Sequence, residues 1–434
     1  MGTARRPFDR TIGIAFLGFI ALGLQGGLLG LAWPSIQTEF ALRPSAVGIF
    51  LLVDTIAFSL VSLNSGALVR RFGVGPLLAV AFLLRGGALF GIMLAPSWPM
   101  IIGLGLLAGG SGGAIDTGLN IHVARYNSTR FLNWLHACFG LGTMIGPLVM
   151  TALFASGLSW RLGYGGAGVF TAVIAVPFVL SRHYWSRYAL PESEEEGGSA
   201  PLLKSLRLPL AWVSVAIFLV YAGLEVGTGQ WAYSLFTAAR AIDPTTAGLW
   251  VSVYWGAFTF GRFIFGAAGD RLSNSAQLRI SIGLALVAVT MLWVNPVDLV
   301  GLVGLGLLGF ALAPAFPVLI ATTADRVGGK HAANVIGMQM GAAGLGVGLL
   351  PGLGGLLVEW NGRSVLRQMT AELAPINTGA LTYDPGMAII APYLFVLAVI
   401  FAALVVIGSV WHIRQNGSGR AEAAPVPATE AASI

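Results

Sequence analysis

Apolar residues form long stretches along this 434-residue chain, and short polar segments separate them. A helix needs about 20 predominantly apolar residues to cross a bilayer, and the chain offers about twelve such stretches. The pattern predicts an all-α membrane protein of about twelve transmembrane helices in two pseudo-symmetric six-helix bundles. The predicted spans are 11–33, 46–69, 74–95, 99–123, 131–156 and 162–181, followed by 209–237, 245–269, 276–294, 299–323, 332–358 and 387–412.

The largest internal polar break contains Pro191, a run of glutamates and two glycines. Such a segment is typical of a linker. We therefore predict four parts: an N-terminal bundle at 1–181, a cytoplasmic linker at 182–208, a C-terminal bundle at 209–413, and a disordered cytoplasmic tail at 414–434. The polar segment 359–386 is predicted to face the other side of the membrane and to be partly ordered.

Composition and charge support a membrane location. Hydrophobic residues make up 56% of the chain and charged residues only 10%, against about 25% charged residues in a soluble protein. The net charge of +6 is spread singly or in pairs between apolar spans, which argues against nucleic-acid binding. Lys and Arg concentrate in the termini and the even-numbered loops, so we expect both termini to be cytoplasmic, in the cell (inner) membrane.

The two halves of the sequence match each other at a displacement of about 200 positions, which is the mark of a duplicated transporter. A further match between the fifth and eleventh spans needs a shift of four residues. The matched segments are 23–25 with 223–225, 57–58 with 257–258, 66–72 with 266–272, and 140–147 with 344–351.

The segment 266–273 (GAAGDRLS) resembles the Gly-x-x-x-Asp-Arg loop signature of the major facilitator superfamily. In its counterpart, 66–73 (GALVRRFG), Arg70 replaces the acidic residue. The resemblance implies that these loops control the conformational change. The gating candidates are Arg70, Arg71, Arg262, Asp270 and Arg271.

Four further motifs resemble the fucose/proton symporter and its relatives among the sodium-dependent sugar carriers. They are 116–120 (DTGLN), 133–136 (NWLH) leading to 146–147, 221–231 (YAGLEVGTGQW), and 337–339 (GMQ) leading to Pro351. The resemblance implies transport of a sugar, coupled to a proton or to sodium. That family carries an acidic residue in its first span, where this chain has Gln25.

Ionisable side chains within the spans point to a functional site, because an ionised group at the bilayer centre costs at least about 2.5–3.5 kcal/mol. Asp116 and Asn120 lie one turn apart on a glycine-rich helix, and Asp116 either binds solute or a proton or pairs with an arginine such as Arg85. Glu225 lies in the glycine-rich stretch 223–229, where we expect the seventh helix to loosen. The proton-coupling candidates are Asp116, Glu225 and Asp54.

Neutral polar and aromatic residues in the spans are the substrate-binding candidates. Amides both donate and accept hydrogen bonds, and aromatic faces can stack on sugar rings, although packing or interfacial roles are open alternatives for each residue. The candidates are Gln25, Asn120, Asn133, His136, Gln230, Trp231, Tyr254, Trp255 and Gln339.

The sequence favours a transporter over an enzyme, because it shows no catalytic constellation, clustered metal site or cofactor-binding loop. We expect a monomeric secondary active transporter of a sugar-like solute, with a proton, or else sodium, as coupling ion. The alternatives are an exporter of amphipathic metabolites or drugs, an uncoupled carrier, and a solute-sensing receptor.

Overall fold

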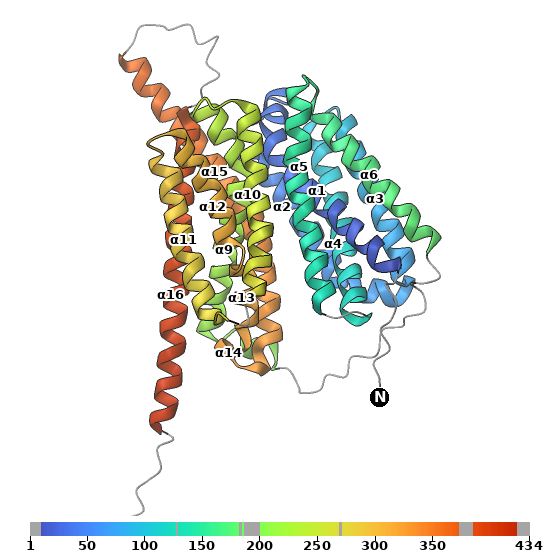
Figure 1. Ribbon diagram of the computed structural model, residues 1–434, viewed down its shortest axis with the longest axis vertical. Helices are drawn as coiled ribbons and strands as arrows, with labels where there is room; N and C mark the ends of the chain where they lie inside the picture. Colours follow the sequence, from blue (N-terminus) through green and yellow to red (C-terminus); the bar gives the residue numbers. More distant parts are fainter. Residues whose placement is uncertain are drawn as a thin grey trace, which may run out of the picture.

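The computed structural model describes residues 10–126, 129–181, 185, 200–268, 271–372 and 385–422. Within these residues every regular element is a helix, which confirms the all-α prediction. Figure 1 shows two helical bundles side by side, one coloured blue to green and the other yellow to red.

The first bundle, the N half, contains six long antiparallel helices. They are α1 (Arg10–Glu39), α2 (Ala46–Phe72), α3 (Val74–Leu94), α4 (Trp98–Tyr126), α5 (Thr129–Ala155) and α6 (Trp160–Leu180). We call the end where α1 begins and α6 ends the linker end, and the opposite end the far end.

The second bundle, the C half, repeats this arrangement with more irregular helices. A short helix, α8 (Leu202–Ser205), lies within the predicted linker. The remaining elements are α9 (Pro209–Ser234), the π-helical turn η1 (Leu235–Ala239), α10 (Pro244–Ala267), α11 (Asn274–Val294), α12 (Asp298–Leu312), α13 (Ala315–Ala321), α14 (Thr323–Val327), α15 (Gly329–Glu372), the 3-10 turn η2 (Pro385–Ile389) and α16 (Ile390–Glu422).

Eleven helical segments of the described chain are long and apolar enough to cross a membrane. Helix α10 is not among them, because it carries Ser252, Tyr254 and Arg262. It nevertheless packs between α5 and α12 inside the assembly. Tertiary packing thus places α10 as the twelfth membrane helix.

Several boundaries differ from the sequence prediction. Helix α9 stays α-helical through the stretch 223–229, so the expected loosening there is wrong, and the irregular turn comes later, at η1. The glycines pack instead: a Cβ on Gly229 would strike the Trp255 ring. The predicted span 299–323 is divided near Pro314 into α12 and α13, since proline removes a backbone donor.

Two helices run further than hydropathy indicated. Helix α15 continues to Glu372, and α16 continues to Glu422, so the start of the tail predicted as disordered at 414–434 is helical. A growing helix gains a hydrogen bond per residue whether or not the residue is apolar. Residues 373–384 and 423–434 lie outside the described part of the chain, as do 182–184 and 186–199 of the predicted linker.

The buried apolar residues show where the halves meet. One core joins far-end residues of the N half, among them Leu31 and Trp33, to residues of the C half such as Trp231. At the linker end the N half has a separate core that includes Phe19 and Phe82, with no member from the C half. Among the described residues, the halves therefore share a core at the far end only.

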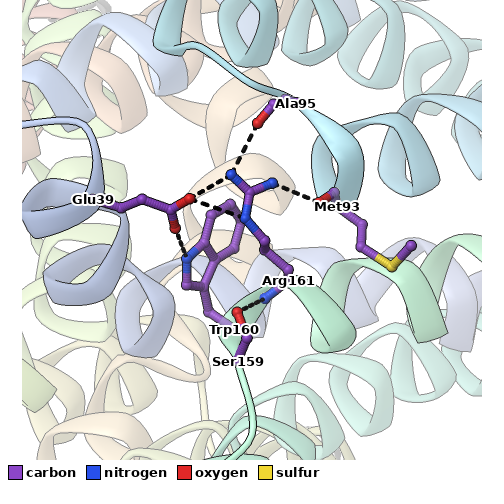
Figure 2. A network of polar contacts seen from close by, with 6 residues as sticks. All are labelled: Glu39, Met93, Ala95, Ser159, Trp160 and Arg161. Carbon is purple, nitrogen blue, oxygen red and sulfur yellow. Dashed lines mark hydrogen bonds and ion pairs between the residues drawn. The ribbon is translucent and has the colours of Figure 1, made fainter.

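Polar contacts fasten the far end of the N half, as Figure 2 shows. The guanidinium of Arg161, at the start of α6, is 2.5 Å from the Glu39 carboxylate at the end of α1. It also donates to the main-chain oxygens of Met93 and Ala95, at the end of α3, over 2.6 and 2.9 Å. These bonds satisfy carbonyls that a helix end leaves open, and they tie three helices together.

Candidate substrate and coupling site

A buried arginine organises the centre of the N half. Arg85, on α3, is only 5% exposed. Its Nη1 donates to the Ala108 oxygen of α4 at 2.7 Å, and its Nη2 donates to the Leu22 oxygen of α1 at 3.3 Å. Its charge interacts with Asp54 of α2, and Gln25 Nε2 donates to Asp54 Oδ1 at 3.4 Å. Arg85 thus acts on Asp54 through its charge, without a direct ion pair between the two side chains among the described residues.

Glycines on α4 make room for this arrangement. A Cβ on Gly112 would collide with Arg85 Nη1, and a Cβ on Gly109 would collide with the main-chain oxygen of Asp54. Gly113 touches α2 one turn further along. The glycine-rich sequence of α4 therefore permits the close helix approach that the sequence indicated, and any side chain at Gly112 would displace the guanidinium.

Asp116 lies on α4 one turn below Gly112 and is half-buried. Asn120 Nδ2 donates to the Asp116 main-chain oxygen at 2.9 Å, and Asn120 also hydrogen-bonds the carboxylate. Within the described part of the chain, no basic residue acts on Asp116, because Arg85 interacts with Asp54 instead. Asp116 is the membrane carboxylate that this structure leaves without a counter-charge among the described residues.

Glu225 of α9 occupies the centre of the C half and is half-buried. The Tyr221 hydroxyl hydrogen-bonds the Glu225 carboxylate and lies 3.0 Å from the Leu312 oxygen. The Tyr254 hydroxyl, on α10, donates to the Glu225 main-chain oxygen at 2.7 Å. The charge of Arg262 also acts on Glu225. Glu225 is therefore compensated by a cation, as Asp54 is.

The two halves use repeat-related positions for these contacts. Gln25 matches Glu225 in the duplication, and Asp54 matches Tyr254. Within each half the structure brings these two positions into contact. Gln25 bonds Asp54 in the N half, and Tyr254 bonds Glu225 in the C half. The duplicated backbone thus keeps the contact while the chemistry of its members has changed.

Arg262 lies where the halves face each other. Its guanidinium stands 4.3 Å above the Phe258 ring, and its Nε is buried without a hydrogen-bond partner. The same charge acts on His136, which belongs to α5 of the N half. His136 is exposed and packs edge-to-face on Phe19, with ring centroids 5.6 Å apart. The charge of Arg262 thus acts on one residue of each half, Glu225 and His136.

Other candidate residues lie deeper in the packing. Trp231 is fully buried and donates to the Pro351 oxygen at 3.0 Å, while Gln339 is fully buried and bonds Thr323 at 3.1 Å. Gln230 is buried with an unpaired Nε2, and Trp255 is 7% exposed. In this conformation these side chains are buried in the packing.

The remaining candidates are at the linker end or are only partly described. Arg70, Arg71 and Arg271 are exposed at the linker end. Asp270 lies outside the described residues. Asn133 lies on α5, and its side chain is also outside the described part of the structure.

Two contributors escaped the sequence analysis as site residues. Tyr221 was quoted only within a motif, although its position one turn before Glu225 placed it beside that carboxylate. Arg85 was recognised as a charge within a span and as one possible partner of Asp116, but not as a site residue. A signal for its true position was the glycine-rich run of α4, which had to accommodate a large neighbour.

Comparison with known proteins agrees with this architecture. The family model described as Major Facilitator Superfamily matches residues 15–239 and again 226–433. An uncharacterized MFS-type transporter of Yersinia pestis is 25% identical over 321 residues, which cover 71% of this chain and 79% of the relative. The enterobactin exporter EntS of Salmonella paratyphi A is 24% identical over 52% of this chain and 55% of its own length.

Solved structures share the fold at low sequence identity. A bacterial homolog of the human lysosomal transporter Spinster, inward-facing and occupied, superposes with a TM-score of 0.71 at 13% identity, covering 94% of this chain and 97% of that one. A point mutant of the nucleoside transporter NupG gives 0.70 at 14% identity, covering 91% and 100%. With its two matched repeats and its pair of helical bundles, the chain belongs to the major facilitator superfamily of membrane transporters.

Proposed function

We propose that this transporter is a proton-coupled symporter that carries a sugar or another small hydroxylated solute by alternating access. The observation that carries the proposal is the distribution of charge in the membrane interior. The charge of Arg85 acts on Asp54 and that of Arg262 acts on Glu225, whereas no cation among the described residues acts on Asp116.

An uncompensated carboxylate in the membrane is costly when ionised, so it binds a proton or another cation when water is excluded. Asp116 then carries the coupling proton, with Asn120 orienting the carboxylate. Asp54 and Glu225 hold the solute or the shape of the site, because each already has a cation to balance it.

The groups around the interface suit a hydroxylated solute. Gln25 and Asn120 can donate and accept hydrogen bonds, and His136 is exposed beside Arg262. Together they provide directional hydrogen bonds with two compensated charges nearby. Such a set favours a neutral polar molecule over a strongly charged one.

The orientation of the site follows from the loop charges. Lys and Arg favour the cytoplasmic side, so the linker end is proposed to be cytoplasmic in the inner membrane. The core that the halves share at the far end would then close the outer side of the membrane. No second chain is required for the site, so we propose a monomer in the lipid bilayer.

Reconstituted liposomes test this proposal. Hexoses, nucleosides and polyols are first ranked by their thermal stabilisation of the purified protein, since a ligand of the folded state raises its stability. The best solute is then offered, radiolabelled, under an imposed pH gradient or sodium gradient. Accumulation driven by the pH gradient supports the proposal. Accumulation under the sodium gradient alone, or binding without flux, refutes proton symport.

A second candidate function is export of a larger amphipathic metabolite. It is favoured by the similarity to the enterobactin exporter, which covers about half of each chain. Everted vesicles distinguish the two functions. Efflux of enterobactin or of amphipathic dyes, with no uptake of hydroxylated solutes, would replace the symporter with an exporter.

A further inference from the structure

The N-terminus of α2 is capped by a residue of the other half. Ser45 occupies the N-cap position, yet its side chain makes no capping hydrogen bond. Its main-chain N–H instead donates to Oε1 of Glu359 at 3.0 Å. Glu359 belongs to α15, so a carboxylate of the C half does what a glutamate in the helix's own first turn does in a capping box.

The Glu359 carboxylate is held where water has little access. Its side chain is 8% exposed, and the neighbouring Arg363, one turn further on, is 68% exposed at 3.7 Å. The positive end of the α2 dipole and the Ser45 N–H therefore provide much of the compensation for this charge. Separation of α2 from Glu359 would leave both groups to find new partners.

Glycines bring the two backbones together at this point. A Cβ on Gly355 would lie 2.6 Å from Ser45 Cα, and a Cβ on Gly48 would lie 2.5 Å from Gly352 Cα. With no side chain between the helices, Glu359, one turn beyond Gly355, reaches over the end of α2. The cap therefore depends on contact between the halves at the far end.

The same face of α15 continues toward the linker end without a partner. Gly344 and Gly348 pack against α2, but Gly337 and Gly341 have nothing within 4 Å of a built Cβ. The glycine face is thus longer than the contact that it makes in this conformation. These two glycines leave room for a second contact of α15 with α2, which would form when the far end opens and the linker end closes.

We call the contact of α2 with α15 at Ser45, Gly48, Gly352 and Gly355 the far-end gate. We propose that Glu359 is its latch: the carboxylate caps α2 across the two halves while the far end is closed and releases α2 when the far end opens. The bond joins two bodies that must separate in a transporter of this superfamily, so it cannot persist through the cycle. The inference requires only the two-half transporter fold, and it is independent of the solute and the coupling ion.

A cysteine behind the gate measures how often the far end opens. Leu52 of α2 packs against Gly348, so Leu52→Cys in a Cys138→Ala background should react with a maleimide faster when α2 and α15 part. The matched variants are Glu359→Gln and Asp243→Asn. Asp243 caps α10 by accepting from the Thr246 N–H at 2.9 Å, which is the same kind of bond within one half.

Glu359→Gln should raise the labelling rate at position 52 about fivefold or more, the effect of losing one charge-assisted hydrogen bond. Asp243→Asn should leave that rate within about twofold of the parent. A second reporter, Ala288→Cys in the buried core of the C half, should not respond to Glu359→Gln, which separates gate opening from unfolding.

Equal rates in the parent and Glu359→Gln would overturn the latch. Equal acceleration by Asp243→Asn, or acceleration at position 288 as well as 52, would show a general loss of stability and would also overturn it. Because labelling requires no solute, these outcomes do not depend on whether sugar transport is found.

Discussion

Replacement of Arg161 tests how strongly the far-end contacts stabilise the N half. Arg161→Ala removes the ion pair with Glu39 and the two bonds to the carbonyls of Met93 and Ala95 (Figure 2). It also removes the cation that lies 4.8 Å from the Trp160 ring. The ends of α1 and α3 would then lose their shared anchor on α6.

The magnitude follows from the exposure of each group. The Arg161 side chain is 24% exposed and that of Glu39 is 39% exposed, so their ion pair contributes at most about 1 kcal/mol. The two carbonyl bonds are less exposed, and each bond from a charged donor contributes about 1.5 kcal/mol. Arg161→Ala should therefore lower the free energy of unfolding by about 3–4 kcal/mol, and Glu39→Gln by about 1 kcal/mol.

Equilibrium unfolding of the purified protein in mixed micelles, followed by tryptophan fluorescence, measures these changes. A double-mutant cycle with Glu39→Gln isolates the ion pair and should give a coupling of about 1 kcal/mol. Arg363→Ala, at an arginine 68% exposed, is the control and should stay within about 0.5 kcal/mol. The reasoning fails if Arg161→Ala matches this control, or if Glu39→Gln is as damaging as Arg161→Ala.

Further predictions concern the site and the gate. Asp116→Asn should abolish gradient-driven accumulation while leaving solute exchange within about threefold of the parent, which flux assays check. Asp54→Asn should lower the free energy of unfolding by about 3 kcal/mol because it leaves Arg85 buried without a counter-charge, which unfolding assays check. Gly341→Leu should preserve stability in this conformation but stop transport, because it blocks the contact of α15 with α2 at the linker end. Gly348→Leu should lower the free energy of unfolding by at least about 1–3 kcal/mol. A stable, fully active Gly348→Leu would contradict the observed packing. Arg262→Ala should weaken solute binding about tenfold or more by leaving Glu225 uncompensated, which calorimetry measures; unchanged affinity would remove Arg262 from the site.

The sequence predicted which charged residues lie inside the membrane better than it predicted which neighbouring helix each side chain faces. Asp54 and Arg85 were both recognised as costly charges within spans, but their interaction was not predicted. Hydropathy reports which residues lie inside the bilayer, whereas pairing depends on the rotation of α2, α3 and α4 relative to one another. Only the close approach permitted by Gly109 and Gly112 fixes that rotation.

The duplication marked repeat-related positions but did not predict their contacts. Gln25 was aligned with Glu225 and Asp54 with Tyr254, and the structure then showed that the first and second spans meet at these positions within each half. The alignment could not predict how each pair bonds. A side-chain contact in the N half became a bond to the main chain of Glu225 in the C half.

Element boundaries were missed where helices leave the apolar region. The predicted eleventh span stopped at 358, before Glu359 and Arg363, yet α15 continues past both, because a helix is held by backbone hydrogen bonds whether or not its residues are apolar. The latch at Glu359 was missed for the same reason. Its partner is a backbone N–H of Ser45, 314 positions away, and no residue type marks such a donor.

The most direct test of proton symport through Asp116 is to measure proton movement during downhill solute entry. De-energised vesicles containing the protein are mixed with the solute that stabilises it best, and the external pH is followed. The parent protein should alkalinise the medium as solute enters, and Asp116→Asn should admit solute with no alkalinisation. Alkalinisation by Asp116→Asn equal to that of the parent would contradict the assignment of the coupling proton to Asp116.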